Sequence, residues 1–190
     1  MEARLSSVSA ARSAQSNHVT LVSSLEELAR LDSRACDELF ARAQVTPLSA
    51  ISGHPRGRML AVPGYEVPLV AGFLRGFAAS GLNLWEGKSF SASPGAHEGR
   101  GFNRVRVPFR RSAFPFRTAA ADSLVDGNPC LSISYDVPEN PAFARATYDE
   151  LRSVGPGLYL GRGMKIRAGR APKLLVWFAL DTNQQDSDPR

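Results

Sequence analysis

The chain has 190 residues, of which 43% are apolar, and this size predicts one domain with a substantial buried core. Its net charge of +5 permits acidic ligands, anionic surfaces or nucleic acid as partners and identifies none of them. The two cysteines, Cys36 and Cys130, are too few for a disulfide framework, and no apolar run reaches the roughly 18 residues of a transmembrane helix, so we expect a cytoplasmic protein.

The N-terminal segment, residues 1–23, is rich in serine and alanine and contains two arginines and one acidic residue. This composition predicts a disordered leader, with an organellar transit peptide as the alternative. The first helix is expected from Ser24 to Gln44. Ser24 and Glu27 form a capping-box pair there, and apolar residues follow at helical spacing.

Two more helices are expected farther along the chain. Pro68 and Gly81 bracket an apolar pattern that predicts a helix near residues 66–80. Pro141, at the first helical position after an asparagine cap, predicts a third helix over residues 141–154.

Most of the remaining chain has the pattern of short strands separated by glycine, proline and asparagine turns. The predicted strands are Arg58–Val62, Leu84–Ser91, Gly101–Phe109, Phe114–Val125, Cys130–Asp136, Leu158–Ile166 and Leu174–Leu180. So few helices cannot cover both faces of a parallel sheet. The sequence therefore predicts a mainly β, α+β fold: an antiparallel barrel or strongly curved sheet with flanking helices. We expect a single domain over residues 24–182 and a disordered polar tail over residues 183–190.

The strand Leu158–Ile166 contains an arginine among apolar residues. Leu160, Arg162 and Met164 share one face by the period of two, so an undistorted strand directs Arg162 toward the interior. A buried guanidinium needs a carboxylate, which a ligand or the protein itself can supply. Two alternatives stay open: a bulge at the flanking glycines turns Arg162 back to solvent, or an internal structural carboxylate pairs with it.

Two other strands offer candidate cavity residues. If Trp85 faces inward, its ring lines the interior and the charges of Glu86 and Lys88 are solvated. The opposite parity makes Glu86 a candidate partner for Arg162. We favour the first arrangement, because charged side chains are rarely buried. Tyr135 lies on an alternating strand and is either a core residue with a bonded hydroxyl or a phenol inside a cavity.

The segment from residue 100 to 117 contains six arginines and no acidic residue, interleaved with phenylalanines. Basic side chains with aromatics are typical of surfaces that bind single-stranded nucleic acid. Alternation with valine is also typical of any half-exposed strand. We therefore predict that Arg104 and Arg106 point to solvent and that Val105 and Val107 point to the interior, and a nucleic-acid partner is not favoured.

The motifs of the common enzyme classes are missing from the sequence. It contains no P-loop, dinucleotide fingerprint, nucleophile elbow or zinc-site spacing, so we expect no cofactor and no metal. Among the three histidines we single out His54 as a possible acid or base, because Arg56 and Arg58 lie close to it in the chain. The sequence identifies no catalytic residue.

Three stretches resemble patterns in small uncharacterised bacterial proteins with a lipocalin-like barrel. They are Trp85–Phe90, Asp136–Pro141 and Gly157–Arg162, with the sequences WEGKSF, DVPENP and GLYLGR. The resemblance extends over residues 50–180. It implies a barrel with a ligand-sized interior and identifies no ligand, and the N-terminal helix departs from a simple lipocalin plan.

The leading hypothesis is a binding or carrier protein for a small, largely apolar molecule with an acidic group, held in a barrel cavity. The expected ligand-binding residues are Trp85, Tyr135, Leu160, Arg162 and Met164. The enzyme alternative is a cofactor-independent isomerase, cyclase or hydrolase of lipid or secondary metabolism, in which Tyr135, Arg162 or His54 polarises the substrate. The third class is a single-stranded nucleic-acid binder. Catalysis needs two or more polar side chains converging in the cavity, and a carrier needs at most one.

Overall fold

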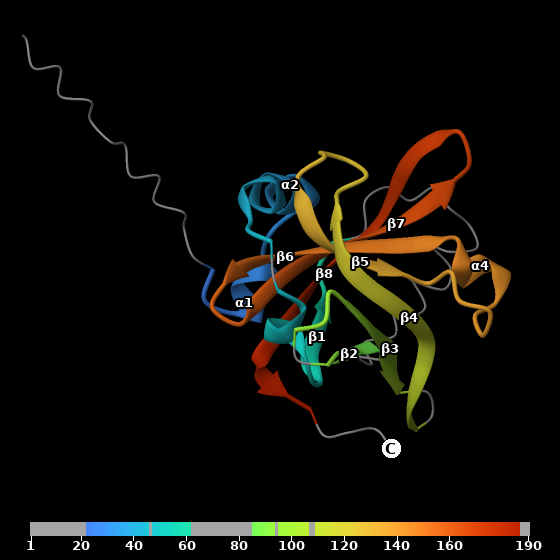
Figure 1. Ribbon diagram of the computed structural model, residues 1–190. Helices are drawn as coiled ribbons and strands as arrows, with labels where there is room; N and C mark the ends of the chain where they lie inside the picture. Colours follow the sequence, from blue (N-terminus) through green and yellow to red (C-terminus); the bar gives the residue numbers. More distant parts are fainter. Residues whose placement is uncertain (1–21, 46, 62–84, 94, 107–108, 187–190) are drawn as a thin grey trace, which may run out of the picture.

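The computed structural model describes residues 22–45, 47–61, 85–93, 95–106 and 109–186. Within them, eight strands form a closed antiparallel barrel in which consecutive strands pair and β1 also pairs with β8 (Figure 1). The strands are β1 Pro55–Met59, β2 Trp85–Ser91, β3 Glu98–Arg106, β4 Arg110–Asp122, β5 Pro129–Ser134, β6 Thr147–Gly155, β7 Leu158–Arg167 and β8 Arg170–Gln185. The mainly β antiparallel fold predicted from the sequence is confirmed.

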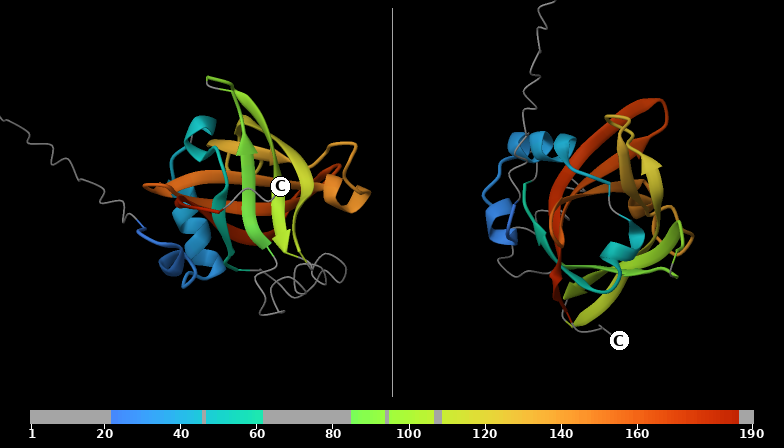
Figure 2. Two further views of the ribbon diagram at one scale, coloured as in Figure 1. Left: turned by 90° about the horizontal axis from the view of Figure 1, so that it is seen from below. Right: turned by 60° about the vertical axis from the view of Figure 1, so that its left-hand side comes forward.

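Short helices flank the barrel: α1 Leu25–Leu28, α2 Ser33–Arg42, the 3-10 helix η1 Leu48–Ile51 and α4 Ala142–Arg145. Helices α1 and α2 pack outside the barrel wall, on the side away from α4 (Figure 2). They divide the helix expected from Ser24 to Gln44, because Asp32 caps a new helix by accepting a hydrogen bond from the Ala35 N–H. No helix among the described residues is long and apolar enough to span a membrane.

Several predicted boundaries differ from the structure or fall outside it. The helix expected near residues 66–80 lies outside the described residues, as does all but the last part of the expected leader. Val22, at the start of the described chain, is buried. At the other end, β8 continues to Gln185, beyond residue 182, where we expected the domain to end.

The helix expected over residues 141–154 is wrong for most of its length. Only the four residues of α4 are helical, and β6 follows directly. In β6, Asp149 and Leu151 face the barrel interior, whereas Glu150 and Arg152 face outward, and all four are buried. Pairing with β5 and β7, together with buried partners on both faces, outweighs the helical spacing of the apolar residues.

Two apolar clusters cover the two faces of the barrel wall. The interior cluster is formed by Leu48, Ile51, Phe90, Phe116, Leu131, Ile133, Tyr135, Leu151, Tyr159, Phe178 and Leu180. The outer cluster packs α1 and α2 against β7 and β8 through residues that include Phe40, Leu160 and Trp177. Because η1 supplies Leu48 and Ile51 to the interior cluster, this part of the barrel interior is filled by the protein itself.

The prediction that Arg162 points into the interior is wrong. The residue is buried on the outer face of the barrel wall. Its neighbour Gly161 faces inward instead, where a Cβ would lie 2.2 Å from the Phe178 ring. The Arg162 Nε donates to Glu150 Oε2 at 2.8 Å. The internal structural carboxylate that we had left as an alternative is therefore present, and it is Glu150.

A second arginine extends this ionic arrangement. Arg152 donates two hydrogen bonds to Asp126, at 2.7 and 2.8 Å, from its two terminal nitrogens. The ring of Phe40 in α2 lies 4.4 Å from the Arg152 guanidinium carbon and 4.3 Å from that of Arg162. We call Arg152, Arg162, Glu150 and Asp126 the outer arginine cluster, and it connects α2 to β6, β7 and the β4–β5 turn.

We expect Arg162→Met to lower the free energy of unfolding by about 3–5 kcal/mol, because it leaves the fully buried Glu150 without its counter-charge. Denaturant unfolding of the purified variant measures this change. Arg117→Met, at an exposed arginine of β4, is the matched control and should change stability little. Equal stability of the two variants would show that the Glu150 pair is dispensable.

A pH dependence follows from Asp126. Hydrogen bonds from Arg152 hold the pKa of the Asp126 carboxyl well below its usual value of 3.8. Such a group contributes stability that is present above the unfolded-state pKa and is lost as the pH falls through the folded-state pKa. The free energy of unfolding should therefore decline below about pH 4, and the decline should be smaller in Asp126→Asn. Urea midpoints of both proteins in neutral and acidic buffer test this, and parallel declines would contradict it.

Candidate functional site

A bulge in β2 places Trp85 and Lys88 on the same side of the barrel wall. In a regular strand, residues three positions apart point to opposite sides. The pairing register shifts between Trp85 and Gly87, and Gly87 has a φ of +133°, which side-chain-bearing residues rarely adopt. A Cβ on Gly87 would also lie 2.4 Å from a backbone oxygen of β1. As a result, Trp85 and Lys88 both face the interior, while Glu86 pairs with Arg106 outside.

The burial of Lys88 corrects the sequence-based interpretation of this strand. We expected its charge to be solvated, yet Lys88 is only 2% exposed. Its Nζ lies 2.9 Å from Asp149 Oδ2, an ion pair inside the barrel. Burial lowers the pKa of Lys88 from its usual value, and the Asp149 carboxylate opposes that shift.

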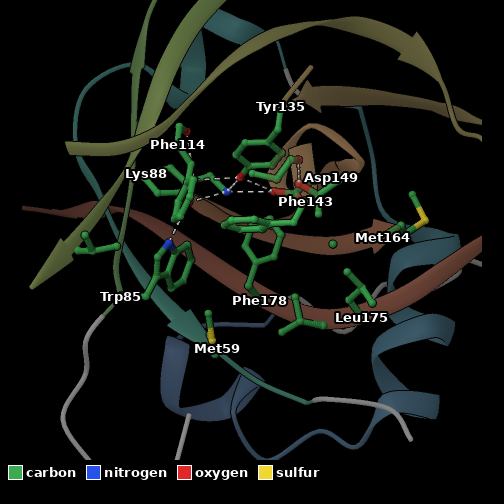
Figure 3. Close-up of a pocket in the computed structure, with 16 residues that line it drawn as sticks. Met59, Trp85, Lys88, Phe114, Tyr135, Phe143, Asp149, Met164, Leu175 and Phe178 are labelled. Carbon is green, nitrogen blue, oxygen red and sulfur yellow. Dashed lines mark hydrogen bonds and ion pairs between the residues drawn. The ribbon is translucent and has the colours of Figure 1, made fainter. Parts of the chain in front are cut away.

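Five side chains form what we call the inner polar network: Trp85, Lys88, Asn103, Tyr135 and Asp149 (Figure 3). The network draws these residues from β2, β3 and β6 and from the end of β5. The Lys88 ammonium donates to Asn103 Oδ1 at 2.9 Å, to Asp149 Oδ2 and to the Tyr135 hydroxyl. All three of its protons are therefore used within the protein.

Groups that can only donate fix the direction of the other hydrogen bonds. Trp85 Nε1, at 3.0 Å, and Lys88 Nζ both donate to the side-chain oxygen of Asn103. The Asn103 amide nitrogen then donates to the Tyr135 hydroxyl at 3.1 Å. This hydroxyl also accepts a hydrogen bond from Lys88, and it donates one to Asp149 Oδ2 at 2.9 Å. Burial raises the pKa of Tyr135 well above its usual value, which keeps the phenol protonated.

Aromatic rings surround the ammonium group of the network. The centroids of four rings lie between 5.0 and 5.7 Å from Lys88 Nζ, and the rings belong to Trp85, Phe116, Tyr135 and Phe178. Their negative faces attract a cation and stabilise it in place of water. The aromatic rings that could bind a cation in this region therefore already surround the ammonium group of Lys88.

A cavity of about 130 Å³ adjoins the inner polar network inside the barrel (Figure 3). Its apolar wall is formed mainly by Met59, Val105, Phe114, Met164, Val176 and Phe178. Ala144 of α4 and Thr147 at the start of β6 also line it. The wall is therefore largely hydrophobic, with the polar network at one place on it.

The hydrogen-bonding capacity left at the cavity wall is that of an acceptor. Asp149 Oδ2 accepts two hydrogen bonds, whereas Oδ1 accepts none from the described residues. The Thr147 hydroxyl donates to the Ala144 carbonyl at 2.5 Å and keeps its own lone pairs. The donors of Trp85, Lys88 and Tyr135 are all engaged. Among the described side chains that line the cavity, no donor remains for a ligand.

Three of the five residues expected to bind a ligand lie together at this cavity: Trp85, Tyr135 and Met164. The other two, Leu160 and Arg162, lie on the outer face of β7 beneath the helices. Gly161 and Gly163 occupy inward positions of this strand, while Leu158 and Leu160 belong to the outer cluster and the register shift after Gly163 precedes Met164 at the cavity. The role of the first three in binding stays a prediction.

Sequence reasoning missed Lys88, Asn103 and Asp149. The one local signal for an inward Lys88 is the glycine before it, which permits the bulge. His54, which we had singled out as a possible acid or base, does not line the cavity, and its Nδ1 lies 2.7 Å from Ser89 Oγ. Within the described chain, no group of three or more histidine, cysteine, aspartate or glutamate side chains is placed to hold a metal ion.

The arginine-rich segment behaves differently from its prediction at one position. Arg104 was expected in solvent but is 1% exposed, and its guanidinium pairs with Asp186 at 3.1 Å. It points away from the interior, and its guanidinium also donates to the backbone oxygens of Pro55 and Glu86. Arg106 is exposed and Val105 lines the cavity, as predicted, while Val107 lies outside the described residues.

Comparison with solved structures supports the architecture. A protein from Thermomonospora curvata, known from its crystal structure, is similar to this chain with a TM-score of 0.50 and 19% sequence identity. The match covers 83% of this chain and 89% of that one. At this level of identity the similarity shows a shared fold alone. The chain matches no protein-family model and no curated protein sequence.

We expect Lys88→Met to lower the free energy of unfolding by about 3–5 kcal/mol, because Asp149 would keep its buried charge without a counter-ion. The double variant Lys88→Met/Asp149→Asn removes both charges and should recover part of that loss. Denaturant unfolding of both variants and the wild type measures the coupling. A single variant as stable as the wild type would contradict the importance of the pair.

Proposed function

We propose that this chain is a binding or carrier protein for a small, largely apolar molecule held inside the barrel. The observation that carries the proposal is the cavity, whose wall is hydrophobic except at the inner polar network. Eight-stranded barrels of this kind can hold one small ligand. The resemblance of three sequence stretches to proteins with a lipocalin-like barrel supports the same proposal.

The size of the cavity sets the scale of the ligand. Its volume of about 130 Å³ is close to that of engineered cavities, about 150 Å³, that hold benzene. We therefore propose a ligand with about one ring. There is no longer a reason to expect an acidic group on the ligand, because Arg162, which was to bind that group, pairs with Glu150.

A cofactor-independent enzyme is the second candidate, and one observation favours it. Several polar side chains converge at the cavity, more than carriage alone requires. An isomerase or hydrolase also needs hydrogen-bond donors aimed at the negative charge that develops on its substrate. The described donors of Lys88 and Tyr135, which would be the natural choice, are engaged within the network. Binding therefore ranks before catalysis.

Part of the arginine- and phenylalanine-rich segment proposed to bind single-stranded nucleic acid does not lie on the surface. Phe114 lines the cavity and Phe116 belongs to the interior cluster, so neither ring is available for stacking on a base. Arg104 is buried as well. Salt-sensitive binding of single-stranded oligonucleotides to the purified protein would restore this alternative.

Partial filling of the cavity tests the proposal. We expect Ala144→Leu, at a buried residue of α4 on the cavity wall, to weaken binding of a single-ring apolar probe such as toluene by roughly tenfold or more. Ala142→Leu, at an exposed residue of the same helix, is the matched control and should bind like the wild type. Calorimetric titration gives the affinities, and native mass spectrometry of the purified protein reports any co-purified small molecule.

The proposal fails if toluene binds none of the proteins and no small molecule co-purifies with the wild type. It also fails if both leucine variants bind the probe as tightly as the wild type, because the molecule would then occupy another place.

A further inference from the structure

Asp149 Oδ1, an unused hydrogen-bond acceptor at the cavity wall, indicates which chemical groups a ligand needs. Asp149 is 94% buried, being 6% exposed, and its Oδ1 accepts no hydrogen bond from the described residues. Gly163, which faces it on β7, also lines the cavity. A Cβ at Gly163 would lie 2.9 Å from Val176 Cγ1 and 3.1 Å from Oδ1, so only a glycine fits beside that oxygen. This oxygen is not fully enclosed and its residue lines the cavity, so a donor on a molecule in the cavity can reach it and form a hydrogen bond to the carboxylate.

The charge balance of the cavity restricts which donor fits. Lys88 and Asp149 compensate each other across 2.9 Å, so the inner polar network has no net charge. A ligand with a carboxylate would face the free oxygen of Asp149 and find no unused donor among the described side chains. A ligand with an ammonium group would add a second cation to an acid that already has its counter-ion, and Lys88 occupies the nearby aromatic faces. Either charge would be buried without compensation.

We infer that the ligand is an uncharged molecule with a hydroxyl or N–H group that donates a hydrogen bond to Asp149 Oδ1. Its remaining part is about one apolar ring, in keeping with the cavity of about 130 Å³. Phenols and small alcohols belong to this class. The inference rests on the proposed function, since it assigns the chemistry of the same cavity.

Four single-ring probes separate the possibilities: phenol, anisole, benzoate and benzylammonium. Anisole keeps the ring and the oxygen of phenol but has no proton to donate. A hydrogen bond to a charged acceptor makes us expect phenol to bind wild-type protein roughly ten- to a hundredfold more tightly than anisole. Both charged probes should bind more weakly than phenol. Isothermal calorimetry measures all four affinities under the same buffer conditions.

A change at the acceptor provides a second, independent measurement. Asp149→Asn keeps the size of the side chain but leaves Lys88 without its counter-ion, so we expect the preference to shift from phenol toward benzoate. Asp122→Asn, at an exposed position of β4, is the control and should keep the ranking of the wild type. If Asp149→Asn does not fold, the ranking of the four probes on the wild type still decides.

The outcomes separate this inference from the proposed function. If anisole binds as tightly as phenol, or if a charged probe binds most tightly to the wild type, the inference is overturned while binding in the cavity stands. If none of the four probes binds wild-type protein, the inference fails, and the proposed function fails with it only if toluene does not bind either and no small molecule co-purifies. A phenol preference that is lost in Asp149→Asn and kept in Asp122→Asn supports the inference.

Discussion

The buried ion pair of Lys88 and Asp149 is the constraint on which the arrangement of the barrel interior depends. Removing these two charges from water costs on the order of several kcal/mol each, and their attraction offsets this only when the remaining hydrogen bonds are made. Asn103 and Tyr135 supply those bonds from β3 and the end of β5. The partners meet only when the barrel has closed, so the same interactions that stabilise its interior also assemble the candidate site.

The local backbone makes this arrangement possible. With regular alternation, β2 would direct Trp85 and Gly87 inward and Lys88 outward. The bulge at Gly87 lets one short strand supply both an aromatic wall and an ammonium group. On β7, Gly163 lets Val176 and Asp149 pack where a side chain would clash, since a Cβ there would lie 2.9 Å from Val176 Cγ1. The cavity is small because most of the interior is packed by side chains of the protein itself.

Most strands and turns were predictable from the sequence because alternation and turn residues are local signals, but β6 was not. The site was less predictable. Lys88 is read as a solvated residue, since burial of a lysine depends on partners that are distant in the sequence. Asp149 was assigned to a helix, because the apolar residues of segment 141–154 also fit helical spacing. Arg162 shows a third difficulty: β7 is buried on both faces, so alternation cannot tell which face is the interior.

Strand β6 places acidic residues next to each other on opposite faces of the wall, with Asp149 paired inside and Glu150 paired outside. A slip of one residue would exchange these faces, and each acid would still find a cation on its new side. The following pair forbids the slip. Leu151 would leave the interior cluster, and Arg152 would enter it without Asp126, the carboxylate that it meets outside. The apolar residue and the arginine therefore fix the register, and the register in turn aims Asp149 at the cavity.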